Sequence, residues 1–131
     1  MWNAQAAIAY LRQHAAARSL GRCAEYTRKA IESGGVKLLH HRSAKDYGSS
    51  LCVAGFRAVT PAPIHLRAGD VAIIQPIPHH PHGHMCMYDG AVWISDFRQL
   101  HGFYPGPSYR AQKPPYAIWR NSAASVPASN R

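Results

Sequence analysis

Acidic side chains are scarce in this sequence. Its 131 residues include 6 Asp and Glu against 15 Lys and Arg, so that the formal net charge is +9 at pH 7. An excess of this size favours a polyanionic partner, such as nucleic acid, an anionic membrane surface or a bacterial cell wall. The basic residues are scattered, however, and no zinc finger, RNA-recognition signature or basic heptad accompanies them. A nucleic-acid-binding module therefore stays only as an alternative hypothesis.

Cysteine is also rare, with only three residues, Cys23, Cys52 and Cys86. A small and odd number excludes a disulfide scaffold, and the lack of a CxxC pair argues against a zinc knuckle. At least one thiol must be free. Cys52 and Cys86 lie within apolar segments, and we predict that both are buried packing residues.

Long apolar runs are missing as well, since no stretch reaches the roughly 18 residues that a membrane-spanning helix needs. The first residues also lack the cationic segment followed by an apolar one that marks a secretory signal peptide. We therefore expect synthesis in the cytoplasm without a signal peptide. If the protein acts elsewhere, another route must deliver it.

The length and the hydrophobic fraction of 47% indicate one domain with a core. Apolar residues at helical spacing predict helices over 4–19, where Asn3 is the cap, over 22–33 and over 43–53. Strand-like patterns follow at 70–75, 83–88, 92–97 and 116–119. This order predicts an α+β domain over residues 1–120, with N-terminal helices packed on a small antiparallel sheet. Residues 121–131 are rich in Ser and Ala and are expected to form a flexible tail.

Cys23 falls in the first turn of the second predicted helix. The unpaired N–H groups and the dipole of a helix N-terminus lower the pKa of a thiol, which favours a nucleophilic role. His84, after Gly83 at the start of a strand, is the candidate base for the thiol proton. The group that orients the imidazole depends on the turn that follows this strand. A three-residue connection places His84 opposite Asp96, whereas a two-residue turn places it opposite Ser95.

Several short motifs in this order resemble a known family. They are Gly21–Tyr26, Gly34–Gly35, Gly69–Val71, Gly83–Gly90 and Trp93–Phe97. The chain resembles the papain-like peptidoglycan amidases of the NlpC type, and within them the second family of type VI secretion amidase effectors. The resemblance covers nearly the whole predicted domain and implies a papain-like, NlpC-type fold.

The resemblance implies a cysteine endopeptidase or amidase that cuts murein peptides and requires no cofactor. It implies Cys23 as the nucleophile, His84 as the general base and acid, and Asp96 as the residue that orients His84. Backbone N–H groups near Cys23 are expected to meet the oxyanion of the tetrahedral intermediate. The substrate cleft is expected to include Tyr26, His82 and Gly83.

The same resemblance implies delivery by a contractile secretion apparatus into the periplasm of a target cell. It also implies an immunity protein that neutralises the enzyme in the producing cell, and we expect the enzyme to be a monomer. Among the bonds of murein it favours the cross-link between diaminopimelate and D-alanine. Related effectors cut between D-glutamate and diaminopimelate, so the scissile bond stays open.

The segment His79–His84 is the densest cluster of potential metal ligands in the chain. Imidazoles bind zinc, but no HExxH motif and no suitably spaced carboxylate accompanies them. The nearby prolines favour an extended loop at the cleft over a preformed site. We expect no metal, and a metal-binding hydrolase is the second alternative hypothesis.

Overall fold

The first helix is shorter than its apolar pattern suggests. The computed structural model describes residues 2–59 and 65–121, and α1 spans Ala4–His14. It begins where the side chain of Asn3 accepts a hydrogen bond from the N–H of Ala6 at 3.0 Å. The predicted continuation to residue 19 fails because the chain turns toward the sheet, where the N–H of Ala16 donates to the carbonyl of Asp96 at 2.9 Å.

The second helix, α2, spans Cys23–Ser33, which confirms the prediction to within one residue. It ends where the N–H of Gly34 donates to the carbonyl of Ala30 at 3.0 Å. The third predicted helix divides into a short 3₁₀ turn, η1 (Ala44–Asp46), and α3 (Gly48–Val53). A further helix, α4 (Pro107–Gln112), occupies a segment for which no helix was predicted. Proline is well tolerated in the first turn of a helix, where its missing N–H has no partner to lose.

The strands form a six-stranded antiparallel sheet in the order β1-β6-β2-β3-β4-β5. Three predicted strands are present with small changes of boundary, as β2 (Val71–Ile74), β3 (His84–Tyr88) and β6 (Tyr116–Arg120). The predicted strand 92–97 is shorter, because β4 (Trp93–Ile94) turns back into β5 (Arg98–Gln99). No local pattern predicted the edge strand β1 (Arg57–Ala58).

The turn between β3 and β4 follows neither of the two predicted registers. Tyr88 pairs with Trp93, and the N–H of Asp89 donates to the carbonyl of Val92 at 3.0 Å, so the connection has four residues, 89–92. The Asp89 carboxylate holds this loop by accepting from the N–H groups of Ala91 and Val92. As a result, β3 and β4 pair in a register that places His84 opposite neither of its two predicted partners.

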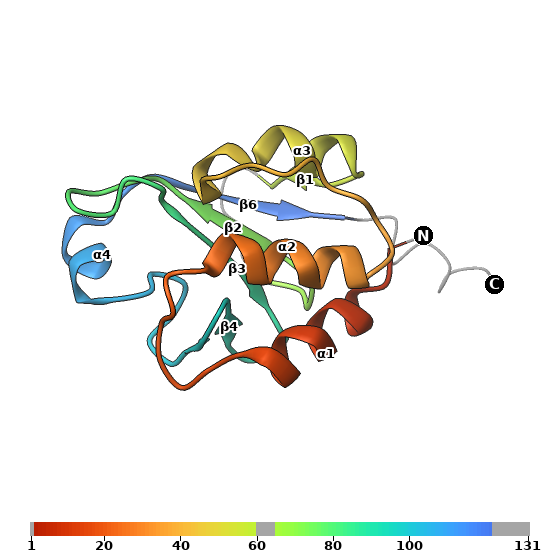
Figure 1. Ribbon diagram of the computed structural model, residues 1–131, viewed down its shortest axis with the longest axis horizontal. Coiled ribbons are helices and arrows are strands. Elements are labelled where there is room, and N and C mark those ends of the chain that lie inside the picture. The colour runs from red at the N-terminus through yellow and green to blue at the C-terminus, as the bar shows by residue number, and fades with distance from the viewer. Residues whose placement is uncertain (1, 60–64, 122–131) are drawn as a thin grey trace.

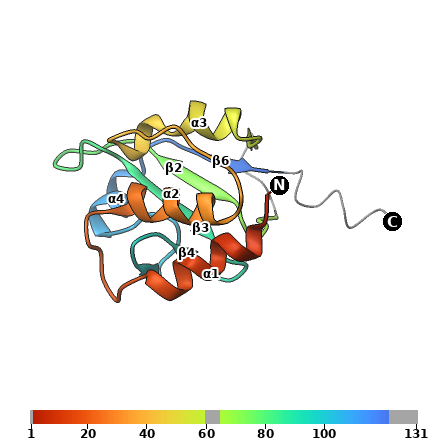
Figure 2. The same ribbon diagram turned by 45° about the vertical axis from the view of Figure 1, so that its right-hand side comes forward.

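The helices cover one face of the sheet. Figures 1 and 2 show α1 and α2 lying side by side across β3 and β4, with α3 near the β1 and β6 edge. Side chains alternate along β2, so that Val71 and Ile73 join the core beneath the helices while Ala72 and Ile74 face clusters on the other side. The predicted α+β class, with N-terminal helices on an antiparallel sheet, is confirmed.

The domain continues slightly past its predicted end. Asn121 is buried at the end of β6, although the flexible tail was predicted to begin there. Residues 122–131 of that predicted tail lie outside the described residues. Within residues 2–59 and 65–121, no helix has the length and apolar character needed to cross a membrane.

Candidate active site

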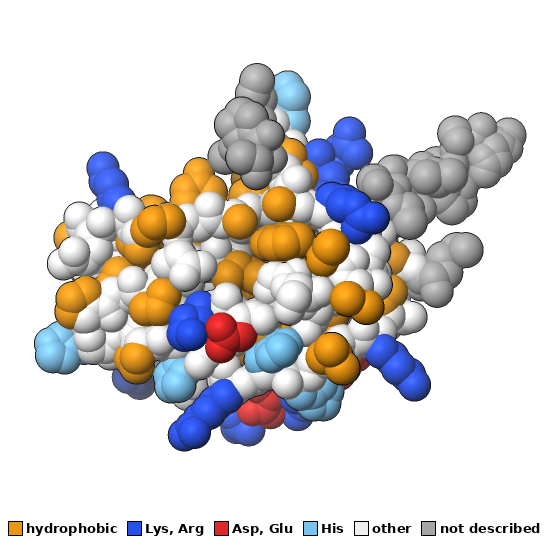
Figure 3. All heavy atoms as spheres, turned by 90° about the horizontal axis from the view of Figure 1, so that it is seen from above, with side chains coloured by type: hydrophobic (Ala, Val, Ile, Leu, Met, Phe, Trp, Pro, Cys, Tyr) orange, Lys and Arg blue, Asp and Glu red, His pale blue; other side chains and the backbone are white. Residues whose placement is uncertain are grey.

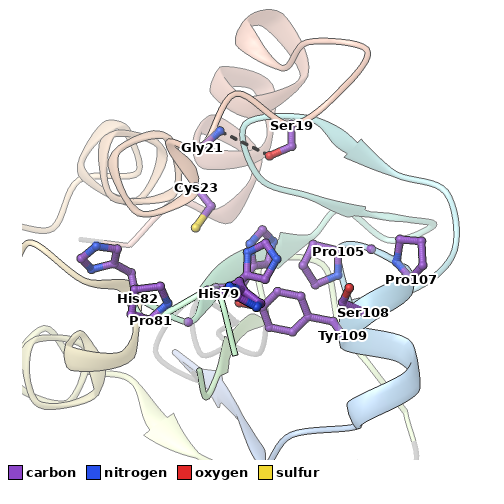
Figure 4. A pocket seen from close by; sticks show the side chains of 14 residues that line it. Ser19, Gly21, Cys23, His79, Pro81, His82, Pro105, Pro107, Ser108 and Tyr109 are labelled. Carbon is purple, nitrogen blue, oxygen red and sulfur yellow. Dashed lines mark hydrogen bonds between the residues drawn. The ribbon is translucent and has the colours of Figure 1, made fainter. Parts of the chain in front are cut away.

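A cleft of about 420 Å³ opens where the start of α2 meets the start of β3. Figure 4 shows the sulfur of Cys23 pointing into it, with His82 and Pro81 on one side and Tyr109 and Pro105 on the other. Its lining comes from three segments that are far apart in the sequence, the last of which runs from Pro105 to Tyr109. The other two comprise Ser19, Gly21 and Cys23, and residues 79–84.

A buried hydrogen bond fixes α2 over the sheet. Thr27 lies one helical turn after Cys23, is fully buried, and donates from Oγ1 to the carbonyl of Met85 at 3.2 Å. Met85 directly follows His84 in β3, so this bond ties the helix of the thiol to the strand of the imidazole. No local pattern in the sequence indicated this contact.

Asp96 holds the segment that leads into Cys23. Its Oδ2 atom accepts hydrogen bonds from the N–H groups of Leu20 and Arg22, both at 2.8 Å, and its Oδ1 atom accepts from the Ser95 hydroxyl at 3.1 Å. The carboxylate is fully buried. It therefore fixes the backbone immediately before the helix, where the direction of the Cys23 side chain is decided.

Burial disfavours the ionised form of the Cys23 thiol. Burial raises its pKa to about 11, the Asp96 carboxylate acts in the same direction, and backbone hydrogen-bonding groups of Met85, Ala24 and Cys23 itself only partly oppose this. The sequence predicted a lowered pKa from the helix N-terminus, and that prediction is wrong because desolvation outweighs the helix dipole here. The thiol must lose its proton during the reaction rather than before it.

His84 is oriented by Gln99. The imidazole Nε2 lies 2.6 Å from Gln99 Oε1, and both side chains are buried. The Gln99 amide nitrogen donates to the carbonyls of Gly102 and Phe103, at 3.1 and 2.8 Å, so its oxygen must be the atom that faces the ring. Since a carbonyl oxygen only accepts, Nε2 carries the proton and Nδ1 is left as the basic nitrogen.

Burial also keeps the imidazole of His84 neutral. It lowers the pKa to about 4, although the Gln99 hydrogen bond and the Asp96 carboxylate act to raise it. A neutral thiol and a neutral imidazole thus face one cleft at neutral pH. The imidazole is in the right form to act as a general base, because its basic nitrogen is unprotonated.

Asp96 does not occupy the predicted position beside the imidazole. In the described part of the chain its hydrogen bonds go to the loop before Cys23 and to Ser95, and the contact with His84 belongs to Gln99. The reason is the four-residue turn after β3 together with the bend into β5, where Gln99 pairs with Trp93. Sequence reasoning missed Gln99 because neither the turn length nor the bend is encoded in a local pattern.

The predicted cleft residues separate into two groups. His82 and Gly83 line the cleft, whereas Tyr26 is not among the described residues around it and packs against the main core. Tyr109 was missed. Its ring is buried in α4 at a centroid distance of 6.2 Å from the ring of His84, in a segment for which no helix was predicted.

The histidine segment is a closed turn rather than an extended loop. Ile77 and His80 exchange backbone hydrogen bonds across it, and His79 at its tip adopts a positive φ of 71°. In residues 2–59 and 65–121, no three His, Cys, Asp or Glu side chains are grouped so that they could hold a metal ion.

The two remaining cysteines differ in their surroundings. Cys86 is fully buried in β3, as predicted. Cys52 is exposed, so that prediction is wrong. It lies on the outer side of the short helix α3, where its apolar neighbour Val53 is also 81% exposed.

The chain is similar to solved structures of a type VI effector. The type VI effector–immunity complex Tae3–Tai3 from Ralstonia pickettii matches with a TM-score of 0.84 and 55% identity, over 91% of this chain and 98% of the matched one. A selenomethionine form of that complex matches with a TM-score of 0.80 and 57% identity, over 86% and 97% of the two chains. The chain belongs to the Tae3 family of type VI effectors.

Membership of the Tae3 family confirms the type VI effector part of the sequence resemblance, and Tae3 replaces the second amidase family to which the motifs pointed. Ly7917 has a TM-score of 0.55 at 18% identity, over 88% of this chain and 62% of its own, and this likeness shows the fold alone. No protein-family model matches the chain, and no curated protein matches it significantly.

Proposed function

We propose that this Tae3-family chain is an antibacterial peptidoglycan amidase in which Cys23 is the nucleophile and His84 the general base and acid. The observation that carries the proposal is that the thiol of Cys23 and an imidazole oriented by Gln99 line one cleft. A thiol, a base and a group that orients the base are the set of parts that nucleophilic acyl transfer requires. Membership of a type VI effector family supports the antibacterial role.

The neutral resting pair sets the order of the chemical steps. As the Cys23 sulfur attacks the peptide carbonyl carbon, His84 Nδ1 takes the thiol proton, and a C–S bond forms while the carbonyl oxygen becomes an oxyanion. The tetrahedral intermediate then collapses, and the imidazolium gives its proton to the leaving amine as the C–N bond breaks. Water, deprotonated by the same imidazole, hydrolyses the thioester and restores the thiol.

We propose that the oxyanion is stabilised by a backbone N–H group near Cys23, at the start of α2. The N–H groups of Leu20 and Arg22 already donate to Asp96, and that of Gly21 donates to the Ser19 hydroxyl at 3.3 Å. We therefore assign the role to the N–H of Cys23 itself. One such donor is typically worth about 3 kcal/mol in the transition state.

Murein is the substrate class we propose, with the diaminopimelate–D-alanine cross-link as the favoured bond and a papain-like, NlpC-type thiol mechanism. The net charge of +9 suits an anionic wall. Figure 3 shows Lys and Arg side chains projecting at several places around the rim of one face. The relatives were crystallised as effector–immunity complexes, which supports a cognate immunity protein for this chain. We further propose delivery by the secretion apparatus into the periplasm of a target cell.

Digestion of purified sacculi tests this function directly. The protein is expected to convert each cross-linked dimer into two monomers whose masses sum to that of the dimer plus one water, as measured by mass spectrometry of the muropeptides. Iodoacetamide is expected to abolish the reaction and EDTA to leave it intact, with a Cys52→Ser background so that alkylation of the exposed thiol has no part in the result. Loss in EDTA with resistance to iodoacetamide would support the metal hypothesis, and salt-sensitive DNA retention without wall lysis would support the nucleic-acid module.

The roles of Gln99 and Asp96 are separable by two nearly isosteric substitutions. Gln99→Met removes the acceptor of the His84 Nε2 proton, and kcat is expected to fall by about 10- to 1000-fold, since the ring loses its orientation. Asp96→Asn keeps an oxygen that accepts from Leu20 and Arg22, and we expect a loss of less than about 10-fold because the backbone stays in place. A larger loss of kcat in Asp96→Asn than in Gln99→Met would return the orienting role to Asp96.

A further inference from the structure

His82 stands at the rim of the cleft with its imidazole fixed from behind. Its Nδ1 atom lies 2.5 Å from the hydroxyl oxygen of Ser43, a buried side chain that precedes η1. Its backbone carbonyl accepts from the N–H of Lys45 at 3.0 Å. Both the ring and the backbone of His82 are therefore held by one segment that does not belong to the catalytic group.

The bond to Ser43 decides which ring atom is left for a ligand. The Ser43 hydroxyl can donate to Nδ1, and in that tautomer Nε2 carries the ring proton and is the donor that an anionic group requires. Within the described residues, Nε2 of His82 makes no hydrogen bond, and the His82 side chain is exposed at the cleft. A rim imidazole that is held by its inner nitrogen thus presents its outer nitrogen to whatever enters.

The lining of the cleft favours a negatively charged group there. Among the described residues that form it, His79, His80, His82 and His84 are histidines and none is Asp or Glu. The chain as a whole carries a net charge of +9. In such surroundings a carboxylate meets no competing anion, and hydrogen bonds to a charged acceptor are about twice as strong as neutral ones.

We propose that His82, positioned by Ser43, binds a carboxylate of the substrate peptide through Nε2 and so selects acidic peptides on the side of Cys23 opposite Tyr109. The inference rests on the proposed function, since murein stem peptides carry carboxylates on D-glutamate, diaminopimelate and the terminal D-alanine. His82 contacts the substrate in this assignment, and Ser43 is a positioning residue.

Binding to an inactive protein tests the carboxylate site without hydrolysis. Isothermal titration of the Cys23→Ala protein would use the free-acid stem peptide and three derivatives, each with one of the three carboxylates converted to a carboxamide. One carboxamide is expected to bind about 10-fold more weakly than the free acid, because it cannot replace a charge-assisted hydrogen bond. In a Cys23→Ala, His82→Asn protein that difference is expected to disappear, since Asn can still meet Ser43 but has no atom at the Nε2 position.

The chain offers a matched control for His82. His41 forms a similar pair with a serine, its Nε2 atom lying 2.6 Å from Ser50 Oγ, but it is not among the described residues that line the cleft. His41→Asn is expected to leave the carboxamide difference at about 10-fold. Ser43→Ala frees the His82 ring but keeps Nε2. In the Cys23→Ala background it is expected to reduce the difference in affinity between the free acid and the carboxamide. In the protein that retains Cys23 it is expected to raise KM and leave kcat nearly unchanged.

The outcomes separate the two proposals. A carboxamide effect that persists undiminished in His82→Asn, equal binding of all four peptides, or no binding of the free acid would each overturn the carboxylate site. Hydrolysis of murein with no effect of His82→Asn would overturn this site and leave the proposed function standing. Binding of the carboxylate through His82 without any hydrolysis by the wild-type protein would overturn the proposed function and leave the carboxylate site standing.

Discussion

A Cys23→Ala variant is expected to fold as the wild type does and to lose peptidoglycan hydrolysis by about 10⁴-fold or more, since without the nucleophile only binding and oxyanion stabilisation act. Its free energy of unfolding is expected to change by about 1 kcal/mol or less. The reason is that Cys23 is only half-buried and stands at the first residue of α2, outside the fully buried core. Release of soluble muropeptides and the urea midpoint measure the two effects.

Cys52 provides the control for this substitution. It is an exposed cysteine on α3, and Cys52→Ala is expected to retain full hydrolysis. Comparable activity in Cys23→Ala and wild type would overturn the thiol mechanism. A loss in both variants would instead indicate a contaminating or indirect activity.

Gly83→Ala is expected to have the largest effect on stability, a loss of about 3 kcal/mol or more in the free energy of unfolding. Gly83 has a φ of 72°, and a Cβ atom there would collide with the backbone carbonyl oxygen of Ile74. Ile74 pairs with His84 in the β2–β3 ladder, so no side-chain rotation relieves the clash. The ladder would have to open at His84, the proposed general base, and activity is expected to fall together with stability in chemical denaturation and hydrolysis assays.

Gly102→Ala separates the clash from the cost of the backbone conformation. Gly102 has a φ of 97°, but a Cβ atom there would meet nothing within 4 Å. The expected loss is about 1 kcal/mol, which is the cost of placing an L side chain in this region. Equal losses in the two variants would show that φ alone, and not the carbonyl of Ile74, makes Gly83 necessary.

Cys23 and His84, the two residues at the centre of the candidate site, could be predicted from the sequence because local helix and strand patterns determine their positions. Cys23 follows from the apolar stripe of one helix and its start, and His84 follows from the beginning of one strand. The structure brings both into one cleft although 60 positions of other structure separate them along the chain. Their local patterns do not show how deeply the side chains are buried. Burial raises the pKa of the Cys23 thiol, whereas the helix N-terminus was expected to lower it.

The role of Gln99 could not be predicted from the sequence, because its position depends on how β3, β4 and β5 are arranged relative to one another. A difference of one residue in the turn after β3 changes which side chains face each other, and the bend from β4 into β5 then brings a later residue to the imidazole. The sequence placed Asp96 beside His84 as its orienting group, but its carboxylate binds the loop before Cys23 instead. That Asp96 is an aspartate predicts a charged hydrogen-bond acceptor, whereas the groups that donate to it are determined by the tertiary structure.

The bonds that hold the site together join distant parts of the chain, and this has a consequence for when the protein is toxic. Thr27 and Met85 are 58 residues apart, and Asp96 binds Leu20 and Arg22 across 76 and 74 residues. Contacts of such separation form only after long stretches of chain have been ordered, so they come late in folding. A nascent or unfolded chain therefore has a thiol and an imidazole but no active site, and it becomes a hydrolase only once the whole domain has folded.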